Sequence, residues 1–154
     1  MSIEAIARLA SEPISLETAL REVEAADCGA VVGFSGVVRD HDAGKGVLSL
    51  SYSAHPSAEQ VLQSVLSELL TEYAPSDVGE AAEQLVDGGS LRIWAAHRIG
   101  DLQIGDPALV CAVAAAHRGL AFEVCSALVD RIKARVPIWK EQFFSDGSVE
   151  WVGL

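Results

Sequence analysis

Apolar positions recur along the chain with two different periods, and each period predicts a different kind of element. Helical spacing is found within residues 15–26, 57–73 and 118–136, so we expect an amphipathic helix in each. Ser15 is a favourable N-cap residue for the first helix. Pro137 ends the third helix, because proline disfavours helical geometry in the residue before it.

Strand patterns lie between these helices. They are short runs of apolar, often β-branched residues that alternate with polar ones or are bounded by glycine. Residues 41–46 and 101–107 are rich in Gly and Asp and are expected to form turns. The predicted strands cover residues 29–39, 47–54, 91–100, 108–116, 138–144 and 149–154.

The length of the chain suits one domain. Its 154 residues are 50% hydrophobic, which is enough apolar material for a core. We therefore expect residues 1–154 to form a single domain of mixed α/β (α+β) class. Residues 74–90 are acidic and rich in small residues, so they are expected to form a loop insert or a short surface helix.

The formal net charge of −11 is unevenly distributed. Residues 1–90 carry 15 acidic and 4 basic side chains, a balance of −11, whereas residues 91–154 carry 7 of each. An acidic chain is a poor nonspecific ligand for nucleic acid or for an anionic membrane, because both require a basic surface. A compact anion held by a few placed cations remains compatible with this charge.

The cysteines and the chain start indicate a cytoplasmic protein. Cys28, Cys111 and Cys125 lie in apolar surroundings without CxxC or Cys/His spacing, so we expect buried thiols and no bound metal. No stretch approaches the roughly 18 to 20 apolar residues of a membrane span, and residues 1–10 do not resemble a signal peptide. We therefore expect a soluble protein in a reducing compartment.

Two lysines flank Pro137. At about 100° per residue, Lys133 shares a helix line with Val129 and Phe122. Either Lys133 is partly withdrawn from water, which favours the neutral amine needed in a base or nucleophile, or it extends its ammonium group past the core. Lys140 follows in an extended stretch, so the two side chains could converge on one site, although Lys140 alone also fits a chance surface lysine.

Three further cationic residues lie at element boundaries, where binding sites are often built. Arg39 ends a predicted strand, and His117 and Arg118 begin the third helix. A helix N-terminus has unpaired N–H groups and the positive end of the helix dipole, so His117 and Arg118 form a candidate phosphate site. The alternative for His117 is a capping or core histidine.

Four short motifs occur in a specific order: V-R-D at the end of a glycine-containing strand, H-R-x-G, A-H-R and K-x3-P-I-W-K. Together they resemble the large, catalytic subunit of molybdopterin synthase. The resemblance covers roughly residues 28–56 and 91–141. It implies a hammerhead-type α/β domain with an additional small antiparallel β subdomain.

The resemblance also implies a sulfurtransferase of molybdenum cofactor biosynthesis that needs no cofactor. Sulfur passes from the C-terminal Gly-Gly thiocarboxylate of a small ubiquitin-like carrier to cyclic pyranopterin monophosphate, which becomes the dithiolene molybdopterin. By motif, Lys133 and Lys140 are the catalytic residues, and Arg39, His117 and Arg118 bind the substrate. The expected assembly is a homodimer within a heterotetramer, with part of each pocket supplied by the neighbouring protomer.

Two features depart from the family pattern. The insert at residues 74–90 lengthens a link that is usually short, and Gln142 occupies a position where a glutamate is expected. The alternative function is a noncatalytic anion- or partner-binding module on the same fold. An unrelated acyl or phosphoryl transferase using Lys133 is a third reading, and it would require no protein partner.

Overall fold

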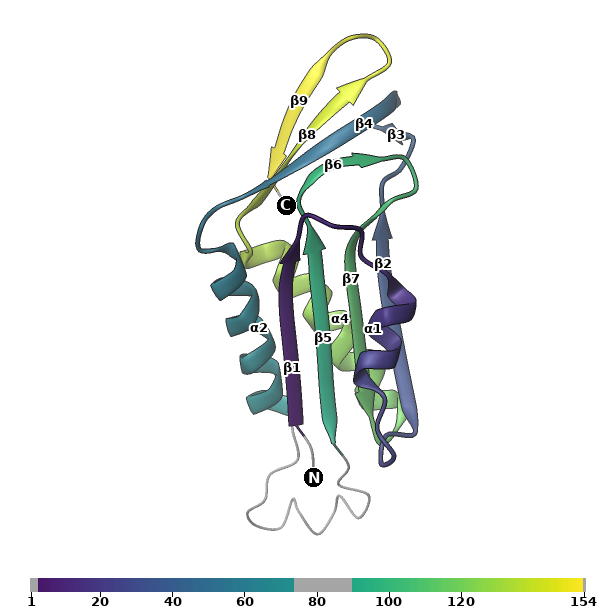
Figure 1. Ribbon diagram of the computed structural model, residues 1–154, viewed down its shortest axis with the longest axis vertical. Coiled ribbons are helices and arrows are strands. Elements are labelled where there is room, and N and C mark those ends of the chain that lie inside the picture. The colour runs from purple at the N-terminus through teal and green to yellow at the C-terminus, as the bar shows by residue number, and fades with distance from the viewer. Residues whose placement is uncertain (1–2, 74–89, 154) are drawn as a thin grey trace.

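A computed structural model describes residues 3–73 and 90–153 and contains two β-sheets, one above the other in Figure 1. The first sheet has four strands in the order β1-β5-β7-β2. Its strands are β1 (Ile3–Ala10), β5 (Leu91–Arg98), β7 (Pro107–Ala115) and β2 (Ala30–Val37). β1 pairs parallel with β5, and the other pairs are antiparallel.

Helices cover both faces of the first sheet. α1 (Leu16–Val23) packs on one face, and α2 (Ala58–Tyr73) and α4 (Arg118–Arg135) pack on the other. Along β7, Cys111 and Val113 belong to the core under α2 and α4, whereas Val110 and Ala112 belong to the core under α1. Burial on both faces explains why residues 108–116 are a continuous apolar run.

The second sheet is antiparallel and extends beyond the end of the first. Its strands β3 (His41–Asp42), β4 (Lys45–Ala54), β8 (Ile138–Phe144) and β9 (Val149–Gly153) lie in that order, and β6 (Gly100–Gln103) also pairs with β4. Tyr52 of β4 lies opposite Lys140 of β8, and Leu50 lies opposite Gln142. Because directly paired residues point to the same face, these four side chains share one side of the sheet.

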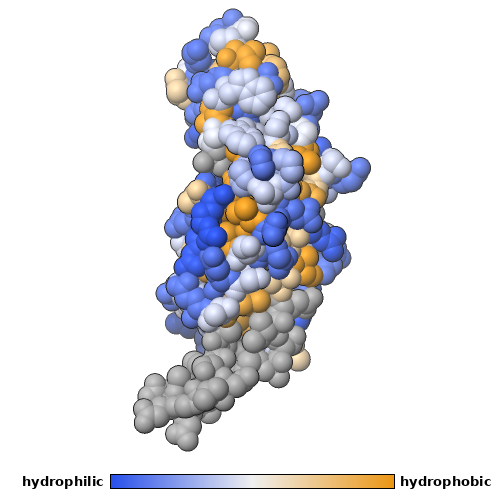
Figure 2. All heavy atoms as spheres, turned by 90° about the vertical axis from the view of Figure 1, so that its left-hand side faces the viewer, coloured by the Kyte–Doolittle hydropathy of each residue, from blue (hydrophilic) through white to orange (hydrophobic). Residues whose placement is uncertain are grey.

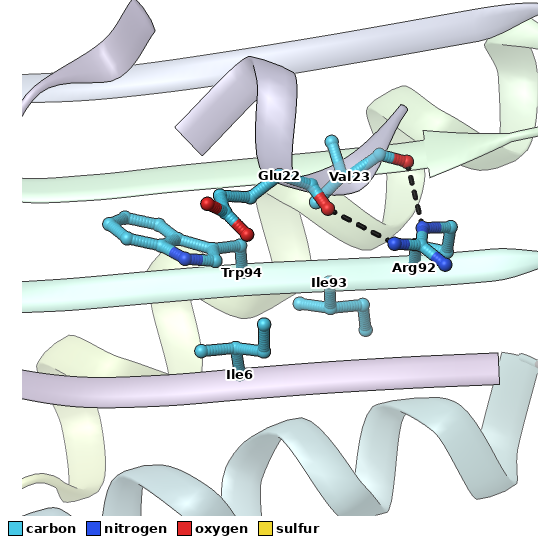
Figure 3. A pocket seen from close by; sticks show the side chains of 6 residues that line it. All are labelled: Ile6, Glu22, Val23, Arg92, Ile93 and Trp94. Atoms are coloured by element: carbon cyan, nitrogen blue, oxygen red, sulfur yellow. Dashed lines mark hydrogen bonds between the residues drawn. The ribbon is translucent and has the colours of Figure 1, made fainter. Parts of the chain in front are cut away.

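Side chains secure both ends of α1. The Ser15 hydroxyl accepts a hydrogen bond from the Thr18 N–H at 3.4 Å, as expected for an N-cap. At the other end, Arg92 of β5 donates from Nε to the Val23 carbonyl at 3.0 Å and from Nη2 to the Glu22 carbonyl at 3.1 Å. Figure 3 shows Arg92 reaching from the strand to these carbonyl groups. The guanidinium therefore satisfies carbonyls that the helix leaves without internal partners.

The outer surfaces of α2 and α4 are joined by ion pairs. Arg131 Nη2 lies 2.7 Å from Glu72 Oε2, and Arg135 pairs with Glu68. Figure 2 shows the side of the molecule that carries α2, where hydrophilic surface surrounds smaller hydrophobic areas.

The predicted helices and most of the predicted strands are present, and the differences concern β1, β3 and β6. The predicted turn at residues 41–46 contains β3 and the first residues of β4, which pair with each other. β1 was not predicted, because its alanine-rich sequence has low intrinsic strand preference and pairing with β5 organises it. The predicted turn at residues 101–107 contains most of β6, which pairs with β4. The predicted insert at residues 74–90 lies, apart from Ser90, outside the described residues.

Candidate active site

A cavity of about 260 Å³ opens where the two sheets and the end of α4 meet. A smaller side hollow of about 50 Å³ adjoins it. The main cavity is lined by Phe34, Gly36, Val37, Arg39, Tyr52, His97, Ala108, Leu109, Lys133 and Lys140. The side hollow shares Val37, Arg39, Tyr52 and Lys140 and adds Val38, His41, Asp42, Leu50 and Gln142.

The turn at Pro137 brings the two lysines to this cavity. Lys133 lies in the last turn of α4, and Val136 adopts an extended backbone with φ −75° and ψ 122°. The chain then enters β8 directly, where Lys140 points to the same side of the second sheet as Tyr52. The predicted convergence of Lys133 and Lys140 therefore agrees with the geometry.

Lys133 is exposed, and Phe122 on the same helix line has 62% of its surface exposed. Of the two alternatives left open for Lys133, partial withdrawal from water is therefore not the one that the structure supports. The structure agrees with the alternative, in which the ammonium group extends beyond the apolar part of the helix.

Arg39 is the third cation at the cavity. It follows β2, and its Nη2 lies 3.6 Å from Asp42 Oδ1 in the side hollow. Its side chain is 65% exposed, so it can reach a ligand without large rearrangement. Arg39, Lys133 and Lys140 thus place three positive charges around one cavity of a chain whose total charge is −11.

His117 and Arg118 do not line this cavity. His117 is the N-cap residue of α4 but makes no capping hydrogen bond with its side chain, and Arg118 begins the helix. Lys133 lies fifteen positions after Arg118 on the same helix, which corresponds to about 22 Å along the axis at 1.5 Å per residue. Within one chain, the structure therefore separates these two predicted substrate-binding residues from the lysines.

Sequence reasoning assigned no role to Tyr52 or His97, which both line the cavity. His97 is only 2% exposed, and its Nδ1 lies 2.7 Å from the Arg98 carbonyl oxygen. Since a carbonyl can only accept, Nδ1 carries the hydrogen and Nε2 is left as an acceptor. His97 is the first residue of the H-R-x-G motif, and this motif, together with a histidine inside the apolar strand at residues 91–98, was the signal that could have identified the position.

The environment of His97 favours its neutral form. Burial lowers its pKa to about 4, the hydrogen bond with Arg98 opposes this change, and the positive charge of Lys133 adds to it. Burial also raises the pKa of Tyr52. The inner wall of the cavity is therefore uncharged at neutral pH, and its positive charge comes from the residues at its edge.

The cysteines lie elsewhere. Cys111 and Cys125 are buried in the core between α4 and the first sheet, and Cys28 is half-buried. Burial raises the pKa of all three thiols. Buried protonated thiols are poor nucleophiles, so sulfur chemistry at this cavity would need sulfur from another molecule.

Within residues 3–73 and 90–153, no group of three or more His, Cys, Asp or Glu side chains is placed to hold a metal ion. No helix in these two ranges is both long enough and apolar enough to cross a membrane.

Comparison with known proteins agrees with the motif resemblance. The family model described as MoaE protein matches residues 9–135. Molybdopterin synthase catalytic subunit 1 of Mycobacterium tuberculosis is 38% identical over 95% of this chain and 89% of its own length. Molybdopterin synthase from Staphylococcus aureus has a similar structure, with a TM-score of 0.79 and 31% identity over 95% of this chain and 96% of that one.

A further solved structure shares the fold at lower identity. It is a complex of subunits 1 and 2 of molybdopterin-converting factor from Helicobacter pylori. Its TM-score is 0.62 at 20% identity, over 98% of this chain and 88% of that one. The family model and the relatives together confirm the resemblance inferred from the motifs, and the chain belongs to the MoaE protein family, that of the molybdopterin synthase catalytic subunits.

Proposed function

We propose that this chain is the catalytic subunit of a molybdopterin synthase and acts as a sulfurtransferase. Sulfur moves from the thiocarboxylated C-terminus of a small ubiquitin-like carrier to cyclic pyranopterin monophosphate, which becomes the dithiolene molybdopterin. The observation that carries this proposal is the convergence of Arg39, Lys133 and Lys140 on one cavity.

Three cations suit this reaction because both reactants are anions. The substrate carries a phosphate and the donor a thiocarboxylate, and two unit charges about 4 Å apart repel by roughly 4 kcal/mol near a protein surface. Positive groups held at the cavity edge offset this repulsion. They also stabilise the negative charge that develops on oxygen as sulfur attacks.

The two lysines have different surroundings, which suggests different roles. Lys133 is exposed at the end of α4, where it can meet the carboxyl terminus of the carrier. Lys140 is half-buried on β8 between the main cavity and the side hollow, so it is better placed to transfer a proton or to stabilise an oxyanion. Arg39 binds the phosphate group.

The assembly we propose is a homodimer of this chain with one carrier subunit at each end. The Helicobacter pylori relative is a complex of two different subunits, which is in line with a separate carrier. In a dimer, His117 and Arg118 of one protomer complete the substrate site of its neighbour, although they lie far from Lys133 within their own chain. The proposed location is the cytoplasm, where thiols stay reduced.

Reconstituted turnover tests this function. The wild-type chain, a thiocarboxylated carrier and cyclic pyranopterin monophosphate should give a product that has gained two sulfur atoms by mass. Lys133→Ala and Lys140→Ala should each lose at least about 99% of this activity, a hundredfold effect comparable with loss of one positioned catalytic group. Arg135→Ala, which removes a cation from the same helix outside the cavity, should keep it.

Two results would contradict the proposal. Full turnover in both lysine variants would remove them from the mechanism. No product from the wild-type chain despite measured carrier binding would favour the noncatalytic module.

A further inference from the structure

A carboxylate and a buried amide meet beside the proposed lysine site. Gln142 on β8 is only 2% exposed, and its Nε2 donates a hydrogen bond of 2.8 Å to Oδ2 of Asp42 on β3. The two residues are 100 positions apart in the chain, so the second sheet alone brings them together. A buried amide is costly without a partner, and the carboxylate provides a strong one.

The other oxygen of Asp42 faces Arg39. Oδ1 lies 3.6 Å from Nη2 of Arg39. The Gln142 hydrogen bond holds the pKa of Asp42 below its usual value, and the charges of Lys140 and Arg39 lower it further. In the part of the chain that the structure describes, Asp42 is the only carboxylate among the residues that line the main cavity and the side hollow.

We propose that Asp42 is a positioning residue that orients Arg39 toward the cavity and sets the negative charge beside Lys140 in the side hollow, and that Gln142 holds the Asp42 carboxylate in the required place. This inference rests on the proposed function, because the roles of Arg39 and Lys140 belong to it. Arg39 needs such a partner most, since its long side chain is 65% exposed and would otherwise sample many rotamers. A bound anion would then meet an arginine whose orientation is already set.

The pair also explains why a glutamine is suitable at position 142, where the family pattern led us to expect a glutamate. A carboxylate at 142 would face the Asp42 carboxylate at hydrogen-bond distance, and two adjacent carboxylates repel or share a proton. With an amide at position 142 and a carboxylate at position 42, the pair has one hydrogen bond and one negative charge. An amide at position 42 and a carboxylate at position 142 should form the same hydrogen bond and carry the same charge.

This exchange provides a matched test with four proteins: wild type, Asp42→Asn, Gln142→Glu, and the double variant. The kcat and KM of reconstituted turnover are measured for each, with thermal unfolding as a check on folding. Each single variant should lose roughly tenfold to a hundredfold in kcat/KM, the effect of misplacing a reacting group by about 1 Å. The double variant should regain most of this loss, because one carboxylate again lies beside the cations.

Asp146→Asn is the control. Asp146 lies in the turn between β8 and β9 of the same sheet and pairs with Lys45 at 3.5 Å, and neither residue lines the cavity or the hollow, so its loss should leave turnover unchanged. A double variant no more active than the worse single variant would overturn the inference, as would full activity of Asp42→Asn.

A second readout keeps this inference separate from the proposed function. The side-chain NMR signals of Arg39 Nε–H and Lys140 Nζ should shift in Asp42→Asn and return toward their wild-type positions in the double variant. Unchanged signals would overturn the positioning role even in an active enzyme. If the wild-type chain shows no turnover but the signals shift in Asp42→Asn, the proposed reaction is contradicted. The effect of Asp42 on the two cations is then still supported.

Discussion

The rings of Tyr52 and His97 meet edge to face, with their centroids 4.8 Å apart and their planes at 76°. Tyr52 comes from β4 of the second sheet and His97 from β5 of the first, so this contact joins the two sheets. Both residues also line the main cavity. The wall of the proposed active site is therefore part of the structure that fixes one sheet against the other.

Replacing Tyr52 should show how much this ring contact stabilises the fold. Tyr52→Phe keeps the ring, whereas Tyr52→Leu removes it. We expect the leucine variant to be less stable than the phenylalanine variant by about 1 to 2 kcal/mol, a value typical of an aromatic pair together with some lost burial. Urea unfolding at pH 7 measures the difference, and equal stability of the two variants would mean that the edge-to-face contact contributes little.

Stability should decrease in acid because His97 is buried in its neutral form. Its pKa is about 4 in the folded chain and about 6.5 when unfolded, so between these values the unfolded chain binds a proton that the folded chain does not. The free energy of unfolding should therefore fall as the pH decreases from about 6.5 to about 4, by up to about 3 kcal/mol from this residue.

The His97→Gln variant isolates this contribution. Urea unfolding at pH 7 and at pH 4.5 gives the loss of stability for each protein. The wild-type chain should lose more stability than His97→Gln over this interval, because the other titrating groups are common to both. Equal losses would show that His97 does not titrate with a lowered pKa.

Substrate binding should depend on ionic strength through Arg39. An exposed guanidinium acts on a phosphate over distances that salt screens, with a Debye length of about 8 Å at 0.15 M. Arg39→Ala should raise the KM for the pterin roughly tenfold, with a smaller effect on kcat, and should weaken the increase of KM with salt. Arg8→Ala removes the same charge from an exposed position on β1 and should leave the KM unchanged.

The core between α2 and the first sheet should respond strongly to lost volume. Leu66 is fully buried in this cluster, whereas the adjacent Ser67 is exposed. Leu66→Ala should destabilise the chain by about 2 to 5 kcal/mol, and Ser67→Ala should change stability by less than about 0.5 kcal/mol. Thermal unfolding compares the two variants. A mild effect of Leu66→Ala would mean that neighbouring core side chains move into the space left by the leucine.

Local patterns predicted most of the elements but not all of their roles. The three helices were predicted because side chains three and four positions apart share a face, and Ser15 and Pro137 mark boundaries through local chemistry. β1 and β6 were not predicted, since their pairing with β5 and β4 depends on segments more than forty residues away along the chain. Strand formation of this kind depends on distant partners.

The candidate site shows the same division. Charge type, the break at Pro137 and the ordered motifs indicated Arg39, Lys133 and Lys140 as cations for an anionic ligand, because these features are local. The exposure of Lys133, the separation of His117 and Arg118 from it, and the participation of His97 and Tyr52 depended on how the two sheets pack.

The sequence by itself determined the class of fold and the family and named Arg39, Lys133 and Lys140 among the candidate cations, because periodicity and motifs can be read along the chain without knowing which segments pair. Tertiary structure alone decided which groups surround those cations. Asp42 and Gln142 meet only because β3 and β8 both flank β4 in the second sheet. A hydrogen bond between residues 100 positions apart has no local pattern, since its geometry is set by the packing of the whole sheet.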